Sequence, residues 1–221
     1  MSNQKVFILL LLGGMFLACK SSGKVANFDD VTSSHQRIAV LPLESKIKLT
    51  DKQKVNVYND EISRLELEQG KEVQEAVERY LINKKLRVTI QSSNMTNAKL
   101  KDNKIDIKNI QDQDYTKLAR LLGVDAVVAG YIETEKPMTD ATATAIDVAK
   151  RLETAYLGTR FGAAVNTSTN KGKCTLSLFD GKTGDRLWTY SEDIEKSKGS
   201  TTSDVINALM NKGARNFPYR K

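Results

Sequence analysis

Apolar and polar positions alternate along the chain with a period that changes several times between residues 37 and 211. Continuous apolar runs predict strands buried on both faces, and strict alternation predicts strands with one solvated face. Apolar positions three and four residues apart predict amphipathic helices. The strands expected on these grounds are Arg37–Leu43, Leu86–Gln91, Ala126–Ile132, Lys173–Phe179 and Arg186–Ser191, and the helices are Asn59–Lys84, Asp112–Leu122 and Thr202–Asn211.

The order of these elements is strand, helix, strand, helix, strand, insert, hairpin, helix, with the insert at Pro137–Lys171. This alternation favours an α/β fold class: a single layered domain with a mixed sheet, a late β-hairpin and a C-terminal helix. The Gly and Asp residues at 180–185 suit the hairpin turn. Thr201-x-x-Asp204 resembles a capping box at the start of the last helix. Gly123 is expected to end the helix Asp112–Leu122.

Two segments leave alternatives open. Gly70 either divides the long helix or marks its true start. Residues 93–112 are polar and carry dispersed lysines, which favours a solvated loop or a frayed helix over a binding patch.

The first 18 residues have the pattern of a targeting segment. Lys5 precedes the apolar run Val6–Ala18, whose 13 residues are too few for a membrane-spanning helix. The sequence Phe16-Leu17-Ala18-Cys19 resembles the lipobox of bacterial lipoproteins. That resemblance implies that Cys19 carries diacylglycerol through a thioether and becomes the mature N-terminus.

These features predict three regions along the chain. Residues 1–18 form a lipoprotein signal peptide, residues 19–35 a lipidated polar tether, and residues 36–221 the α/β domain. His35 falls at the end of the tether and is expected to be solvated. Cys174 alternates with Leu176 and Leu178, so it is expected to be a buried small hydrophobic residue.

Charge and composition exclude several function classes. Loss of the signal peptide removes Lys5 and lowers the net charge from +7 to +6. The lysines are dispersed and no aromatic residues interleave with them, so nucleic-acid binding is not expected. The lysine surplus instead favours solubility or contact with anionic envelope surfaces.

No catalytic or metal-binding pattern is present, so we expect no enzyme, no cofactor and no metal site. Gly181-Lys182-Thr183 looks like the end of a phosphate-binding loop, but Leu176 stands where that loop needs glycine. The chain has 1 His and 2 Cys, too few for a zinc site rich in these residues.

Three segments carry a resemblance to a known group of envelope proteins: Arg37–Leu43, Ala119–Ile132 and Leu176–Trp188. Together they resemble the α/β domain of lipoproteins related to the curli secretion channel CsgG and the penicillin-binding-protein activator LpoB, and the N-terminal domain of TolB. Asp180, Thr183, Gly184 and Trp188 match the late hairpin turn of that group. Hairpin geometry and core packing explain these four residues equally well, so no catalytic role is assigned to them.

The resemblance implies two different functions. A CsgG-like subunit would donate membrane-spanning hairpins from the insert, but charged residues such as Asp147 and Lys150 interrupt the alternation that a lipid-facing strand needs, and residues 145–156 fit a helix better. We therefore expect a non-catalytic accessory lipoprotein that binds an unidentified envelope protein, with the channel subunit as the alternative.

The expected location is the outer membrane, facing the periplasm, with the lipid at Cys19 as anchor. The insert is either the interaction element or an ordinary surface helix that covers a sheet edge. A homo-oligomer is left open.

Overall fold

The computed structural model describes residues 21–49, 59–135, 170–196 and 200–220. Its strands form one mixed sheet in the order β1-β7-β6-β5-β2-β4, with β3 placed beside β5. Parallel pairing joins β2 to β4 and joins both β2 and β3 to β5, whereas β5, β6, β7 and β1 pair antiparallel. The strands are β1 (Ser21–Lys24), β2 (Arg37–Val40), β3 (Glu44–Lys48), β4 (Thr89–Gln91), β5 (Ala126–Glu135), β6 (Asn170–Asp180) and β7 (Arg186–Lys196).

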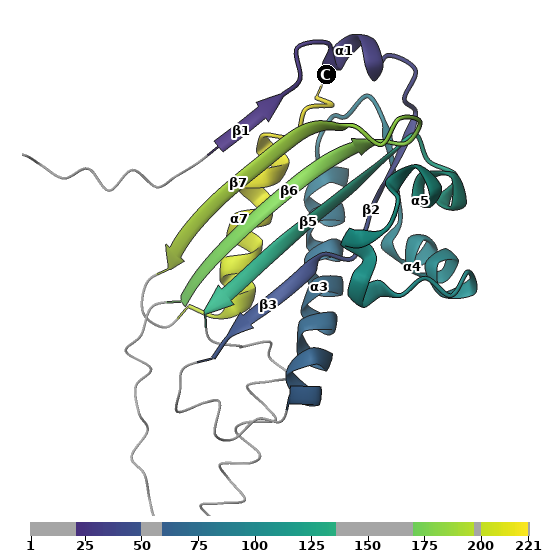
Figure 1. Ribbon diagram of the computed structural model, residues 1–221. Helices are drawn as coiled ribbons and strands as arrows, with labels where there is room; N and C mark the ends of the chain where they lie inside the picture. Colours follow the sequence, from purple (N-terminus) through teal and green to yellow (C-terminus); the bar gives the residue numbers. More distant parts are fainter. Residues whose placement is uncertain (1–20, 50–58, 136–169, 197–199, 221) are drawn as a thin grey trace, which may run out of the picture.

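Helices cover the two faces of this sheet unequally. Figure 1 shows α3 and α7 behind the sheet along its length, while α4 and α5 lie at the side of β2. The helical elements are α1 (Phe28–Val31), α3 (Asn59–Ile82), α4 (Ser93–Asp102), the 3₁₀ turn η1 (Ile107–Asp112), α5 (Tyr115–Leu122) and α7 (Thr202–Arg215). The α/β class with a mixed sheet, late hairpin and C-terminal helix is confirmed.

The main hydrophobic core lies between the sheet and the helices α3 and α7. Cys174, Leu176 and Leu178 of β6 point into it, as do Leu209 and Met210 of α7. Cys174 is fully buried, as expected, and its burial raises the pKa of the thiol far above its usual value. It is therefore a packed core residue and not a reactive thiol.

A second, smaller core lies on the opposite face, under α4 and α5. Val127 and Ala129 of β5 pack there against Leu118 and Leu122 of α5. Along the same side of β5, the next residues are Tyr131, Glu133 and Glu135, which are partly or fully exposed. Thus among the described elements this face is covered at one end only.

Two glycines are required by the backbone geometry around α3 and α5. Gly70 neither divides α3 nor starts it: a Cβ there would lie 2.2 Å from the Leu43 carbonyl oxygen, so glycine lets the helix pass against this backbone. Gly123 ends α5 with φ +70°, in the left-handed region that the expected glycine cap requires.

Several segments differ from the sequence-based expectations. Residues 93–102 form the ordered helix α4, because Ser92 caps its N-terminus and Leu100 is fully buried. Strand β3 was not expected, since only Ser45 and Ile47 of its residues are buried. Strand β4 is shorter than expected and starts at Thr89.

The segment expected to be a tether also differs. Ser21–Lys24 is the edge strand β1, which pairs with β7, and Phe28 of α1 is fully buried. The polar composition hid this docking because an edge strand needs few apolar side chains. The insert, up to residue 169, and Cys19 lie outside the described residues.

Candidate functional site

A buried polar cluster joins His35, Asp180 and Tyr219. The His35 Nε2 atom lies 3.0 Å from Asp180 Oδ1, and its Nδ1 atom lies 2.5 Å from the Tyr219 hydroxyl. All three side chains are at most 5% exposed. The cluster holds the N-terminal segment, the β6–β7 turn and the C-terminal residues together at one end of the sheet.

The protonation states in this cluster follow from burial. Desolvation lowers the pKa of His35, and this effect outweighs the attraction of the Asp180 carboxylate, which raises it. Desolvation likewise raises the pKa of Tyr219 above its usual value. A neutral imidazole therefore donates from Nε2 to Asp180 and accepts the Tyr219 proton at Nδ1.

These contacts fasten three separate segments of the chain to one another. Each of the three side chains already has a partner, and a substrate would have to displace one of them from the core. The expectation that His35 is solvated is wrong. No sequence signal links His35 to Asp180 or Tyr219, which are 145 and 184 positions away.

The Gly181-Lys182-Thr183 turn is not a phosphate-binding loop. Asp180 Oδ2 accepts hydrogen bonds from the backbone N–H groups of Lys182 at 3.1 Å and Thr183 at 2.8 Å. It also accepts one from the Thr183 hydroxyl at 3.0 Å. The amides that would hold a phosphate are thus engaged by the turn's own carboxylate.

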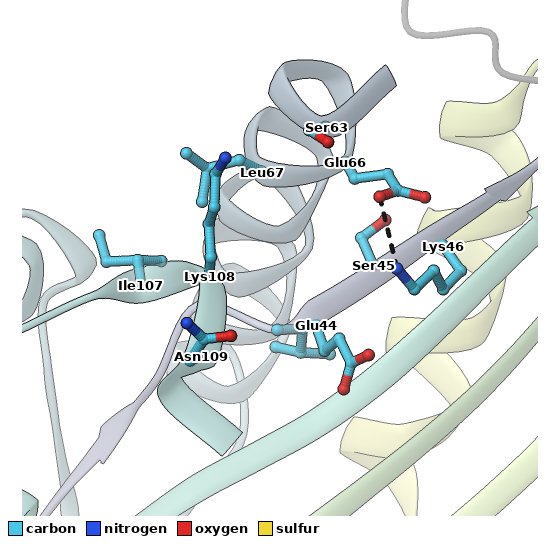
Figure 2. Close-up of a pocket in the computed structure, with 10 residues that line it drawn as sticks. Glu44, Ser45, Lys46, Ser63, Glu66, Leu67, Ile107, Lys108 and Asn109 are labelled. Carbon is cyan, nitrogen blue, oxygen red and sulfur yellow. Dashed lines mark ion pairs between the residues drawn. The ribbon is translucent and has the colours of Figure 1, made fainter. Parts of the chain in front are cut away.

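A small pocket of about 230 Å³ lies at the free edge of β3, between α3 and η1. Figure 2 shows Lys46 and Glu66 on one side of it, paired at 3.6 Å, and Lys108 beside Leu67 on another. Glu66 also accepts a hydrogen bond from the Ile47 N–H at 3.1 Å. Ligand pockets usually enclose about 300 Å³ or more, and the Glu66 carboxylate already serves the strand edge, so this pocket is a weak candidate.

The third candidate lies on the part of the sheet that no described element covers, and it consists of two rows of alternating charge across β3, β5, β6 and β7. We call them the charged rows. Strand register places each set of four side by side on neighbouring strands. The first row is Lys48, Glu135, Lys171 and Glu195, and the second is Lys46, Glu133, Lys173 and Asp193.

Contacts within the charged rows are lateral and solvated. Lys48 Nζ lies 2.6 Å from Glu133 Oε1, and Lys171 Nζ lies 3.9 Å from Glu195 Oε2. The hydrogen bond to Lys48 lowers the pKa of Glu133, and the same bond raises the pKa of Lys48. Burial, with Glu133 nearby, raises the pKa of Tyr131 to about 12. Lys48 and Glu133 are therefore charged and Tyr131 is neutral at neutral pH.

The described residues contain neither a group of metal-ligand side chains nor a helix suited to span a membrane. No group of three or more His, Cys, Asp or Glu side chains there could hold a metal ion. None of the helices described is long and apolar enough to span a bilayer. Lipidation at Cys19 lies outside the described ranges and stays a prediction.

No family model matches the chain, and no curated protein matches its sequence. Several solved structures resemble the fold of this chain at low sequence identity. A PelC dodecamer from Paraburkholderia phytofirmans is 12% identical, with 93% of this chain and 100% of that chain covered and a TM-score of 0.48. Lipoprotein GNA1162 from Neisseria meningitidis is 16% identical, with 81% and 96% covered and a TM-score of 0.42.

The LpoB C-terminal domain from Salmonella enterica is 8% identical, with 76% of this chain and 91% of that chain covered and a TM-score of 0.34. With TM-scores below 0.5, none of these three likenesses assigns a function to the chain. LpoB is also one of the proteins that the sequence motifs resemble, whereas CsgG and TolB remain resemblances in sequence alone.

Proposed function

We propose that this protein is a lipid-anchored accessory lipoprotein of the cell envelope that acts as a non-catalytic protein-binding module. The observation that carries the proposal is the apolar run Val6–Ala18 followed directly by Cys19. A membrane anchor at that cysteine accounts for the short apolar segment, which is about seven residues below the length of a spanning helix.

The side chains of the described domain support the non-catalytic part of the proposal. The buried His35 is neutral and has both ring nitrogens engaged, and Cys174 is packed in the core. The exposed charges lie in balanced rows on an open sheet, which suits recognition of another protein surface better than turnover of a small substrate.

The position of β1 adds an orientation to the proposal. Strand β1 starts at Ser21, two residues after Cys19, and pairs with β7. A lipid at Cys19 would hold this edge of the sheet close to the bilayer instead of on a long tether. Lys20 follows the cysteine where an Asp would favour inner-membrane retention in enteric lipoproteins, so the outer membrane, facing the periplasm, is the proposed location.

The test is the variant Cys19→Ala, expressed in a host that lipidates proteins and labelled with a palmitate analogue. We expect loss of the label together with release from membranes or accumulation of the unprocessed chain. Cys174→Ala is the matched control, because it removes the other cysteine and should keep both label and membrane recovery. Membrane recovery of Cys19→Ala equal to that of the unaltered protein would refute the anchor.

A second candidate function is a subunit of an oligomeric secretion channel. It is favoured by the pairing of β5 and β6, which continues to Glu135 and Lys171 on the two sides of the insert, the place from which a CsgG-like hairpin would start. A detergent-solubilised mass of many subunits, lost on deletion of residues 140–165, would favour the channel over the accessory protein.

A further inference from the structure

The charged rows have a symmetry that follows from the sheet order. Within the charged rows each strand carries a single sign: Lys46 and Lys48 on β3, acidic residues on β5, Lys171 and Lys173 on β6, and acidic residues on β7. The sequence of signs is therefore plus, minus, plus, minus. Reversing the strand order converts this pattern into its opposite.

We propose that the charged rows form an interface between two copies of this chain, packed face to face about a twofold axis that runs parallel to the strands between β5 and β6. Rotation about this axis leaves each row at the same position along the strands and reverses the order of the strands across the sheet. Lys171 then faces Glu135 of the second copy, and Lys173 faces Glu133. Lys46 faces Asp193 and Lys48 faces Glu195 in the same way, so all eight charges meet the opposite sign.

The alternative orientation is repulsive. A twofold axis in the sheet plane but perpendicular to the strands keeps the strand order, so Lys171 and Lys173 would face the same two lysines. Like charges placed opposite one another repel and disfavour an interface. The pattern therefore selects one orientation, which is the property expected of a specific contact and not of a random charged surface.

Geometry and exposure allow this packing. Stacked sheets lie about 10 Å apart, a distance that a lysine and a glutamate reaching toward each other can span. Lys46 and Lys48 are 54% and 58% exposed, and Lys171 and Glu195 are 49% and 53% exposed. Glu44, Tyr131, Thr175 and Ser191 continue the polar surface beside the rows, and under the same axis Glu44 faces the neutral Ser191 of the second copy. Figure 1 looks onto this face, and none of the labelled helices crosses its β3, β6 and β7 strands there.

Charge balance argues for a second copy over other occupants. The charged rows contain four lysines and four acidic residues, so they attract neither nucleic acid nor an anionic bilayer as a whole. A partner must carry the same alternation in reverse, and another copy of this chain does so by symmetry. The proposal does not depend on the lipid at Cys19.

The test measures the mass of the full chain by sedimentation in mild detergent, with micelles in excess over protein. We expect a dimer at about 50 mM salt that dissociates at about 500 mM, where charges more than a few ångströms apart are screened. The β6 variant Lys171→Glu/Lys173→Glu should be monomeric at both. The β5 variant Glu133→Lys/Glu135→Lys should be monomeric too.

Mixing the β5 and β6 variants is the decisive experiment, because it tests whether opposite charges on the two chains restore the dimer. In a mixed pair, the acidic β5 and β6 of one chain face the basic β6 and β5 of the other, so the mixture should form a dimer again. This recovery also shows that both variants are folded. Lys101→Glu/Arg120→Glu makes the same charge change on exposed positions of α4 and α5 and should leave the dimer intact.

A monomer at low salt would overturn the proposal, as would an oligomer that the β6 variant does not change. Failure of the mixed variants to associate would overturn it as well. Each of these outcomes is independent of palmitate labelling at Cys19, so it leaves the lipid anchor untouched.

Discussion

The His35–Asp180–Tyr219 cluster and the charged rows are both polar, yet they lie in opposite environments. In the cluster, neutral and charged groups are almost fully enclosed and each has a fixed partner. In the charged rows, the Lys171 and Glu195 side chains are about half exposed, and their charged atoms come no closer than 3.9 Å. An enclosed polar group fixes one arrangement of the chain, because an unpaired partner is costly, whereas exposed charges cost little to rearrange and stay available for binding.

The largest effect should come from removing the carboxylate at the centre of the cluster. Asp180→Ala leaves the His35 Nε2–H and the amides of Lys182 and Thr183 without their acceptor. The buried His35 Nε2–H costs about 1–3 kcal/mol when it has no acceptor, and each lost hydrogen bond of the turn contributes about 1 kcal/mol, so we expect the free energy of unfolding to fall by about 3 kcal/mol or more. Urea denaturation followed by circular dichroism measures it.

Asp185→Ala is the matched control for this prediction, because it removes an exposed aspartate from the same turn. Its effect should stay within about 0.5 kcal/mol, as for most surface substitutions. Equal losses in the two variants would show that the turn, and not the buried contact with His35, is the source of the stability.

The sequence predicted the elements of this cluster better than the cluster itself. The turn at 180–185 and the capped helix at Thr201 follow from local rules that hold within a few residues. The contact between His35 and Asp180 depends on how the N-terminal segment crosses the end of the sheet, which no local period encodes. His35 looked like part of a solvated stretch because its neighbours are polar.

The charged rows could be predicted from the sequence only in part, because they too depend on contacts between distant segments. Lys171 and Lys173, like Glu133 and Glu135, stand two residues apart, a spacing that places each pair on one face of a strand. The expected strands Ala126–Ile132 and Lys173–Phe179, however, left out Glu133, Glu135 and Lys171. Their alternation across the sheet needs the register of four strands, including β3, which was not expected at all. Pairwise register is a tertiary property, so the face could not be predicted from the periods alone.

A change of pH should have a smaller effect on the free energy of unfolding, through the protonation of His35 in the same cluster. Burial lowers the pKa of folded His35 below the 6.5 of an exposed histidine. Below pH 6.5 the unfolded chain binds a proton that the folded chain resists, so stability should fall as the pH drops from 7.5 to 5.5. The loss has a ceiling of about 1.4 kcal/mol for each pH unit below 6.5.

Urea midpoints at the two pH values measure this change, with His35→Gln as the reference variant. The charged and titratable groups that face His35 are Asp180, Tyr219, Asp125 and Lys182. The chain has 1 His, so His35→Gln should abolish most of the difference. A variant that keeps the full pH dependence would contradict the assignment to this residue.

The smallest effect should be found in the charged rows, where Lys171 and Glu195 form a lateral pair. A double-mutant cycle with Lys171→Ala and Glu195→Ala, measured by urea denaturation at about 500 mM salt, keeps the protein monomeric and isolates the pair's own contribution to folding. Exposed pairs usually couple by less than about 1 kcal/mol, and salt screens them further, so we expect a coupling energy below about 0.5 kcal/mol. The same substitutions should weaken the dimer at low salt, because each removes a charge that faces the second copy. A coupling energy comparable to the loss in Asp180→Ala would mean that the rows hold the fold together as the buried cluster does, and the contrast between the two regions would fail.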